Sequence, residues 1–127
     1  MARLAAEVNQ AKKAAKKSKK PKGNPNPKGK EVTSTQYARD PEVISWVLDE
    51  AKGNCERCDA EAPFVREDGT PYLEVHHVTR LADKGPDTIE NAVAICPNCH
   101  RELHYGAEKE IKAIELVDKV TRLISFD

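Results

Sequence analysis

The residues of this chain that can bind metal ions are concentrated in one stretch. All four cysteines and all four histidines of the 127-residue sequence fall between positions 55 and 104. The cysteines form two Cys-x-x-Cys pairs: Cys55, Cys58, Cys96 and Cys99. Two such pairs are typical of a tetrahedral zinc site to which each pair supplies two thiolates. The spacing therefore predicts one structural Zn²⁺, with a redox pair or an iron–sulfur site as the alternatives.

The histidines need a separate explanation. His100 and His104 are four residues apart in a predicted helix, so their rings lie on one face. Cys99 is turned about 100° away from His100 around the same helix. One helix can therefore offer a thiolate to zinc on one side and two imidazoles to a second metal ion on the other.

His76 and His77 are neighbours in a predicted strand, where successive side chains point to opposite faces. One of them can thus bind a metal ion while the other acts as a general base. The alternative is that each histidine is structural. A histidine after a Cys-x-x-Cys pair can also bind the zinc in place of a cysteine, or contact the zinc ligands. Four histidines within 29 residues favour a shared chemical role.

The elements that must position these residues are short. A helix begins at Asp40-Pro41, with Asp40 as the cap and Pro41 in the first turn, and Gly53 ends it. A strand at 64–66, an Asp-Gly turn at 67–70 and a strand at 72–78 form a predicted hairpin. The later predictions are a capped helical turn at 87–90, a strand at 92–95, a helix at 96–105 and a final helix at 107–125. The apolar face of the final helix is predicted to be Ile111, Ile114, Val117, Val120 or Leu116, and Leu123 or Ile124.

Charge divides the chain into two parts. Residues 1–30 carry ten basic residues and one acidic residue, whereas residues 31–127 carry eleven basic and twenty acidic residues. A frayed helix is predicted over 1–20 and a Pro/Gly linker over 21–30. We expect a basic arm and linker at 1–31 and a folded domain at 32–127, with a core at 53–106. Such an arm indicates an anionic partner, and a solvated lysine tail is the alternative.

Composition narrows the class of protein. The sequence has one Trp and two Phe, and a core this poor in large apolar residues often needs a structural metal. No stretch approaches the roughly 18 apolar residues of a membrane span, and no secretory signal is visible. We therefore expect a cytoplasmic protein without a membrane partner, whose thiols bind metal rather than form disulfides.

Three segments together resemble the zinc-containing branch of the HNH nucleases. They are Leu-Glu-Val-His-His-Val at 73–78, Gly-Pro-Asp-Thr-Ile-Glu-Asn at 85–91, and Ala-Val-Ala-Ile-Cys-Pro-Asn-Cys-His-Arg-Glu-Leu-His at 92–104. The resemblance extends over 37–106 and covers His77 and Asn91, between the two cysteine pairs, and His100, directly after the second pair. Within this branch the segments are most similar to the catalytic domains of modified-cytosine-dependent restriction endonucleases.

The resemblance implies a small α+β fold and a role for each histidine. The expected core is a ββα-metal unit of strands 73–78 and 92–95 on helix 96–105, stapled by the Cys₄ zinc. A helix is expected on each flank, behind a disordered or frayed basic arm. His77 matches the general base, and Asn91 the residue that orients it. The expected ligands of the catalytic ion are His76, His100 and, as a third, His104.

The implied function is metal-dependent hydrolysis of DNA phosphodiester bonds, in a restriction, mobile-element or phage setting. Mg²⁺, Mn²⁺, Ni²⁺ and Zn²⁺ are candidate catalytic ions, and imidazole ligands favour the transition metals. Arg80, Lys84 and Arg101 are candidates for phosphate contacts, or else ordinary surface charges. We expect a homodimer or a separate recognition domain, since the chain is too short to add such a domain. The alternative function is a non-catalytic, zinc-dependent nucleic-acid-binding or scaffold module.

Overall fold

The computed structural model describes residues 7–10 and 20–125 and divides the chain into two units between Ser34 and Thr35. In the first unit, residues 7–10 are helical, and residues 20–34 are exposed without helix or strand. Of the frayed helix predicted over 1–20, residue 20 is not helical, and residues 1–6 and 11–19 lie outside the described residues. The second unit begins three residues after the predicted domain start and contains every metal-binding side chain considered below.

Helix α2 (Pro41–Ala51) begins as its sequence predicts. The Asp40 carboxylate accepts the N–H of Glu42 at 2.9 Å, and Pro41 follows the cap. The helix ends where Lys52 adopts a left-handed backbone with φ 54°, one residue before the predicted Gly53. Its buried face packs on the sheet through Val47 and Ala51.

The sheet has two antiparallel strands, β1 (Glu74–His77) and β2 (Ala92–Ile95). Strand β2 has the predicted bounds, and all of its side chains are fully buried. Strand β1 is shorter than the predicted 72–78. The predicted strand at 64–66 is wrong, because only Val65 forms a bridge there, with Pro71. The N–H of Arg66 donates to the carbonyl of Thr70 and the N–H of Tyr72 donates to the carbonyl of Phe64, so the two segments pair only around this one bridge.

Helix α3 (Pro97–Tyr105) begins at Cys96 and ends at Gly106, close to the predicted 96–105. Helix α4 (Lys109–Lys119) is shorter than the predicted 107–125, because Val120 leaves the helical backbone at ψ 104°. The chain then turns, and Leu123 packs into the core. The predicted apolar face is partly wrong, since Ile111 and Ile114 are exposed and Leu116 is the buried residue of α4.

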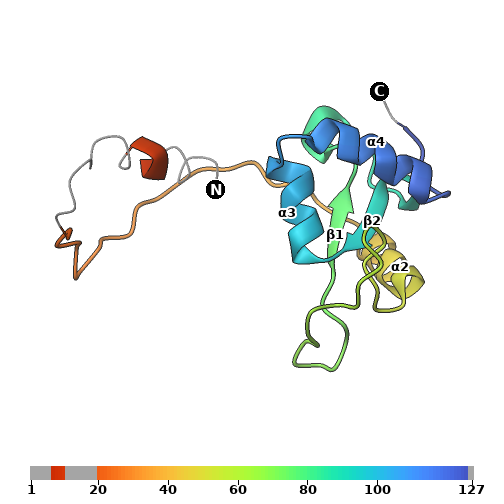
Figure 1. Ribbon diagram of the computed structural model, residues 1–127, viewed down its shortest axis with the longest axis horizontal. Coiled ribbons are helices and arrows are strands. Elements are labelled where there is room, and N and C mark those ends of the chain that lie inside the picture. The colour runs from red at the N-terminus through yellow and green to blue at the C-terminus, as the bar shows by residue number, and fades with distance from the viewer. Residues whose placement is uncertain (1–6, 11–19, 126–127) are drawn as a thin grey trace. The chain divides into compact units, whose positions relative to one another are not determined.

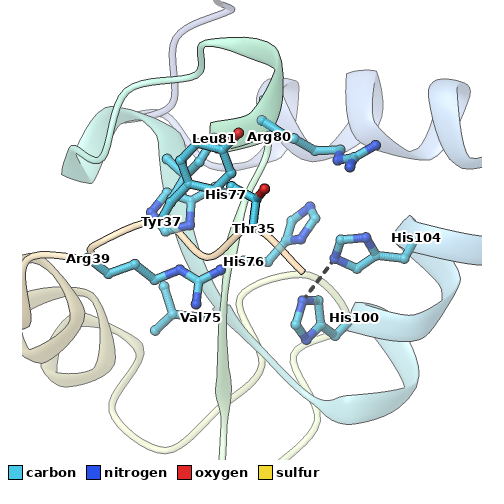
Figure 2. A pocket seen from close by; sticks show the side chains of 11 residues that line it. Thr35, Tyr37, Arg39, Val75, His76, His77, Arg80, Leu81, His100 and His104 are labelled. Carbon is cyan, nitrogen blue, oxygen red and sulfur yellow. Dashed lines mark hydrogen bonds between the residues drawn. The ribbon is translucent and has the colours of Figure 1, made fainter. Parts of the chain in front are cut away.

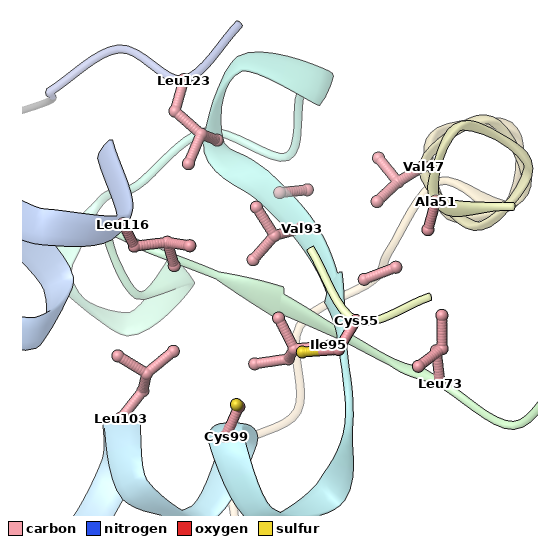
Figure 3. Packing of buried hydrophobic residues seen from close by; sticks show 12 residues of the cluster. Val47, Ala51, Cys55, Leu73, Val93, Ile95, Cys99, Leu103, Leu116 and Leu123 are labelled. Atoms are coloured by element: carbon pink, nitrogen blue, oxygen red, sulfur yellow. The ribbon is translucent and has the colours of Figure 1, made fainter. Parts of the chain in front are cut away.

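The core forms around β2 (Figure 3). The side chains of β2 lie between α2 on one side and α3 and α4 on the other. Cys55 and Cys99 belong to this cluster, so the thiols connect directly to the apolar core. Figure 1 shows α4 beside α3 and the two strands at the centre of the second unit. This arrangement confirms the expected α+β class, with β1, β2 and α3 in the ββα order.

A buried ion pair between Arg122 and Glu56 connects the C-terminal segment to the rest of the domain. Arg122 donates two hydrogen bonds to the carboxylate of Glu56, at 2.8 and 2.7 Å. The same guanidinium donates to the carbonyls of Ile89 and Ala92. Glu56 also accepts the N–H of Ala94. The segment after α4 is thus bonded both to β2 and to the first cysteine pair.

Candidate active site

Within the described part of the chain, one cluster of metal-binding groups consists of thiols. The sulfur atoms of Cys55, Cys58, Cys96 and Cys99 all lie within 4.8 Å of one another, and none forms a disulfide. The Sγ atoms of Cys58 and Cys96 are 3.9 Å apart. Two sulfurs bound to tetrahedral zinc at about 2.3 Å would be about 3.8 Å apart. The four thiols therefore fit one Zn²⁺.

A second cluster consists of imidazoles. His76 of β1 and His100 and His104 of α3 bring one ring nitrogen each within 4.8 Å of the others. The Nε2 atoms of His100 and His104 are 3.1 Å apart, as the dashed line in Figure 2 marks. Two nitrogens bound to one ion at 2.0–2.1 Å would be about 2.9–3.4 Å apart. These three residues, the imidazole triad, fit one divalent ion on their own.

A histidine must be neutral to bind a metal ion, and burial favours the neutral form of the ring. His76 is 5% exposed, and desolvation lowers its pKa to about 3, with the nearby rings of His100 and His104 adding to the effect. The pKa of His104 is also lowered, first by burial and then by His100. Both imidazoles therefore keep a free lone pair at neutral pH, as a metal ligand must.

A carboxylate orients one ring of the triad. Nδ1 of His100 lies 2.8 Å from Oε1 of Glu74, and the hydroxyl of Tyr72 donates to Oε2 of Glu74 at 2.5 Å. The bond from Tyr72 is the largest cause that lowers the pKa of Glu74, so the carboxylate is ionised. His100 consequently donates from Nδ1 and presents Nε2 to the triad. No local signal in the sequence marks Glu74 as a functional residue, because its partner lies 26 residues away in the chain.

His77 lies apart from the triad and has a carboxylate of its own. Its ring is buried, and Nε2 is 2.8 Å from Oδ1 of Asp87. The other oxygen of Asp87 accepts the N–H of Asp40 at 2.6 Å. Partial burial raises the pKa of Asp87, but the bonds from Asp40 and His77 outweigh it, and the net pKa is lowered. Asp87 was predicted to cap the turn at 87–90; instead its side chain binds these two groups, and the 3₁₀ turn is Ile89–Asn91.

Asn91 is fully buried and closes the loop between the strands. Its Oδ1 accepts the N–H of Thr79 at 2.8 Å, and its Nδ2 donates to the carbonyls of Thr79 and Pro86 at 2.9 and 2.8 Å. Gly85 lets the loop close, because a Cβ there would lie 2.0 Å from the carbonyl oxygen of Thr79. Asn91 and Gly85 thus hold the backbone just before Asp87.

All four histidines line one cavity of about 380 Å³ (Figure 2). Three residues that precede α2 also line it and were missed in the sequence, because no motif marks them: Thr35, Tyr37 and Arg39. Of the predicted phosphate contacts, Arg80 lines the cavity and is 65% exposed in its side chain. Lys84 and Arg101 are exposed but are not among the lining residues.

Comparison with known proteins assigns the segment that contains the cysteine and histidine clusters to a family. Residues 55–106 match the family model described as HNH endonuclease. The chain carries an HNH endonuclease domain. Both metal clusters, His77 and Asn91 lie within the matched residues of the HNH domain.

The relatives of the HNH domain are restriction enzymes. The chain is 54% identical over 86 residues to the type IV methyl-directed restriction enzyme EcoKMcrA of Escherichia coli strain K12, covering 68% of this chain and 31% of that protein. It is 38% identical to the structure of the type IV phosphorothioation-dependent restriction endonuclease ScoMcrA, with a TM-score of 0.61, covering 68% of this chain and 19% of that one. The modification-dependent restriction endonuclease TagI matches over 54% of this chain and 24% of its own, at 33% identity and a TM-score of 0.45. The chain thus spans less than a third of each relative.

Proposed function

We propose that this HNH domain is a metal-dependent endonuclease that hydrolyses DNA phosphodiester bonds. The observation that carries the proposal is the arrangement of the four histidines around one cavity. Three of them gather nitrogens for a single divalent ion, while His77 lines the same cavity with its Nε2 held by Asp87. A site that only bound DNA would not need a separated histidine beside a metal-binding triad.

Each residue has a definite task in this chemistry. A divalent ion bound by the triad would supply positive charge that stabilises the transition state and the leaving oxygen. Neutral His77 accepts a proton from the attacking water. Arg80 and Arg39 reach the cavity and bind non-bridging phosphate oxygens. Asn91 holds the loop, and with it the partner of His77.

We assign different ions to the two clusters. The thiols hold a structural Zn²⁺ that takes no part in the reaction. The triad offers only imidazole nitrogens, which suit Mn²⁺, Ni²⁺ or Zn²⁺ better than Mg²⁺. We therefore expect Mn²⁺ or Ni²⁺ to support cleavage at least as well as Mg²⁺.

The names of the relatives suggest the substrate. EcoKMcrA is described as methyl-directed and ScoMcrA as phosphorothioation-dependent. We propose that this chain takes part in the restriction of modified DNA, with the HNH domain supplying the cutting step. The basic residues of 1–30 would add affinity for the DNA backbone that falls steeply with salt. Because one such site cuts one strand, we propose that cleavage of both strands uses two copies.

Nicking of supercoiled plasmid tests the proposal. The full chain is incubated with methylated or unmethylated plasmid and with Mg²⁺, Mn²⁺, Ni²⁺ or Zn²⁺ in turn. We expect metal-dependent nicking, slowed about 10²- to 10⁴-fold in His77→Ala, which removes the base and keeps the triad. Lys119→Ala, on the surface of α4, is the control variant and should nick the plasmid as the parent does. Equal inactivity of parent and His77→Ala, with DNA binding retained, would favour a non-catalytic zinc-dependent module.

A further inference from the structure

We propose that Asp87 is a positioning residue that fixes the tautomer and orientation of the His77 ring. The inference rests on the proposed nuclease function, since it assigns the nitrogen through which His77 acts. By this assignment Nε2 carries the ring proton, and Nδ1 is the nitrogen that takes a proton from water.

The hydrogen-bonding capacity of a carboxylate dictates the tautomer. Oδ1 of Asp87 lies 2.8 Å from Nε2 of His77, and the side chains are 19% and 6% exposed. An ionised carboxylate can only accept, so Nε2 must donate. A neutral imidazole has one N–H, and its remaining lone pair is therefore on Nδ1.

Asp87 is itself held on two sides. Its Oδ2 accepts the N–H of Asp40, the residue that caps α2. The carbonyl of Pro86, immediately before Asp87, accepts the Nδ2 of Asn91. The carboxylate is thus fixed between the start of α2 and the loop that Asn91 closes. The positive charge of Arg39 also favours its ionised form. A group held in this way can keep the His77 ring in one orientation.

Asp87→Asn separates this role from simple packing. Asparagine has the same shape but offers one oxygen and one NH₂ group. If the oxygen keeps the bond from Asp40, the NH₂ group faces Nε2 of His77. Nε2 must then accept, and the ring proton moves to Nδ1. The substitution should therefore reverse the tautomer without removing a side chain from the structure.

The first measurement reads the tautomer directly. Nitrogen-15 NMR of the histidine rings is recorded on the full chain with its zinc, above neutral pH and without a second divalent ion. We expect the Nε2–H form of His77 in the parent and the Nδ1–H form, or a mixture, in Asp87→Asn. An Nδ1–H form in the parent overturns the proposal, even if the variant does not fold. This test needs no cleavage, so it stands apart from failure of the proposed function.

The second measurement reads the consequence for catalysis. We expect Asp87→Asn to lower kcat by at least about tenfold, up to the loss caused by His77→Ala, with KM changed by no more than about twofold. The double variant should be no slower than His77→Ala alone, because both changes disable one base. Glu90→Gln, which removes the same charge from the next turn, is the matched control. An unchanged kcat in Asp87→Asn, or additive losses with a lower melting temperature, would overturn the role.

Discussion

Two of the four histidine rings are held by carboxylates that approach from different elements. Glu74, on β1, binds Nδ1 of His100 on α3. Asp87, in the loop between the strands, binds Nε2 of His77. We propose that Glu74 turns Nε2 of His100 toward the metal position, whereas Asp87 leaves Nδ1 of His77 free to accept a proton. Similar partners therefore give two imidazoles different chemical tasks.

Glu74→Gln should weaken metal binding at the triad. The substitution replaces an ionised acceptor of the His100 Nδ1–H with a neutral amide, and loss of such a partner typically lowers metal affinity about 10- to 100-fold. Isothermal titration calorimetry of the zinc-loaded chain with Mn²⁺ measures the change in Mn²⁺ affinity. Zinc content should stay the same, and Glu61→Gln on the neighbouring loop should bind Mn²⁺ as the parent does. Parent-like affinity in Glu74→Gln would show that Glu74 does not support the ligand.

Burial of His76 should make the fold sensitive to acid. Its folded pKa is about 3, below the ordinary value of 6.5, so the unfolded chain binds more protons between these values. The contribution of His76 to the free energy of unfolding is therefore nearly constant well above pH 6.5 and falls as the pH drops toward 3. Without added divalent ion, His76 should account for about 1 kcal/mol of the loss between pH 6.5 and 5.5. Urea unfolding at both pH values should show a correspondingly smaller loss in His76→Gln. Equal losses would place the acid sensitivity elsewhere.

At the scale of the elements, local signals were enough to predict the helix starts but not the contacts that build the site. Asp40-Pro41 and Cys96-Pro97 each place a capping residue before proline, and α2 and α3 begin there. Strand β2 was predicted from its apolar run alone. By contrast, the pairs that hold the domain and its histidines together lie 10, 26 and 66 residues apart in the chain. Periodicity and turn signals report on neighbours in sequence, so they carry no information about such pairs.

Arg122 should matter more to stability than an exposed ion pair. Its partner Glu56 is 11% exposed, and removing the guanidinium in Arg122→Leu leaves a carboxylate charge without its cation and two carbonyls without the bonds from Arg122. We expect a loss of about 3 kcal/mol in the free energy of unfolding. The exposed pair of Lys119 with Asp59 should contribute less than about 1 kcal/mol. Urea unfolding of Arg122→Leu and Lys119→Ala compares the two, and equal losses would contradict the account.

At the scale of the whole molecule, the thiol cluster joins segments that are otherwise connected through a small core. One cysteine pair follows α2 and the other begins α3, and Cys55 and Cys99 are buried beside β2. Zinc binding to such a site contributes directly to folding. No helix among the described residues is long and apolar enough to cross a membrane.

Cys99→Ser should therefore lose both zinc and cooperative folding. A serine hydroxyl is a poor replacement for a buried thiolate ligand, so the site should not close. Elemental analysis should find about one zinc per chain in the parent and much less in the variant. Thermal unfolding followed by circular dichroism should be cooperative only in the parent. A zinc-free variant that still unfolds cooperatively would show that the metal is not needed for the fold.

We propose that α3 serves two metal sites of different chemistry, with Cys99 facing one and His100 and His104 facing the other. Anomalous diffraction from a crystal of the full chain soaked in Mn²⁺ tests this directly. We predict a zinc peak bonded to the four cysteine sulfurs and a separate manganese peak bonded to His76, His100 and His104. A single metal held by both sulfur and imidazole ligands, or no manganese at the triad, would contradict it.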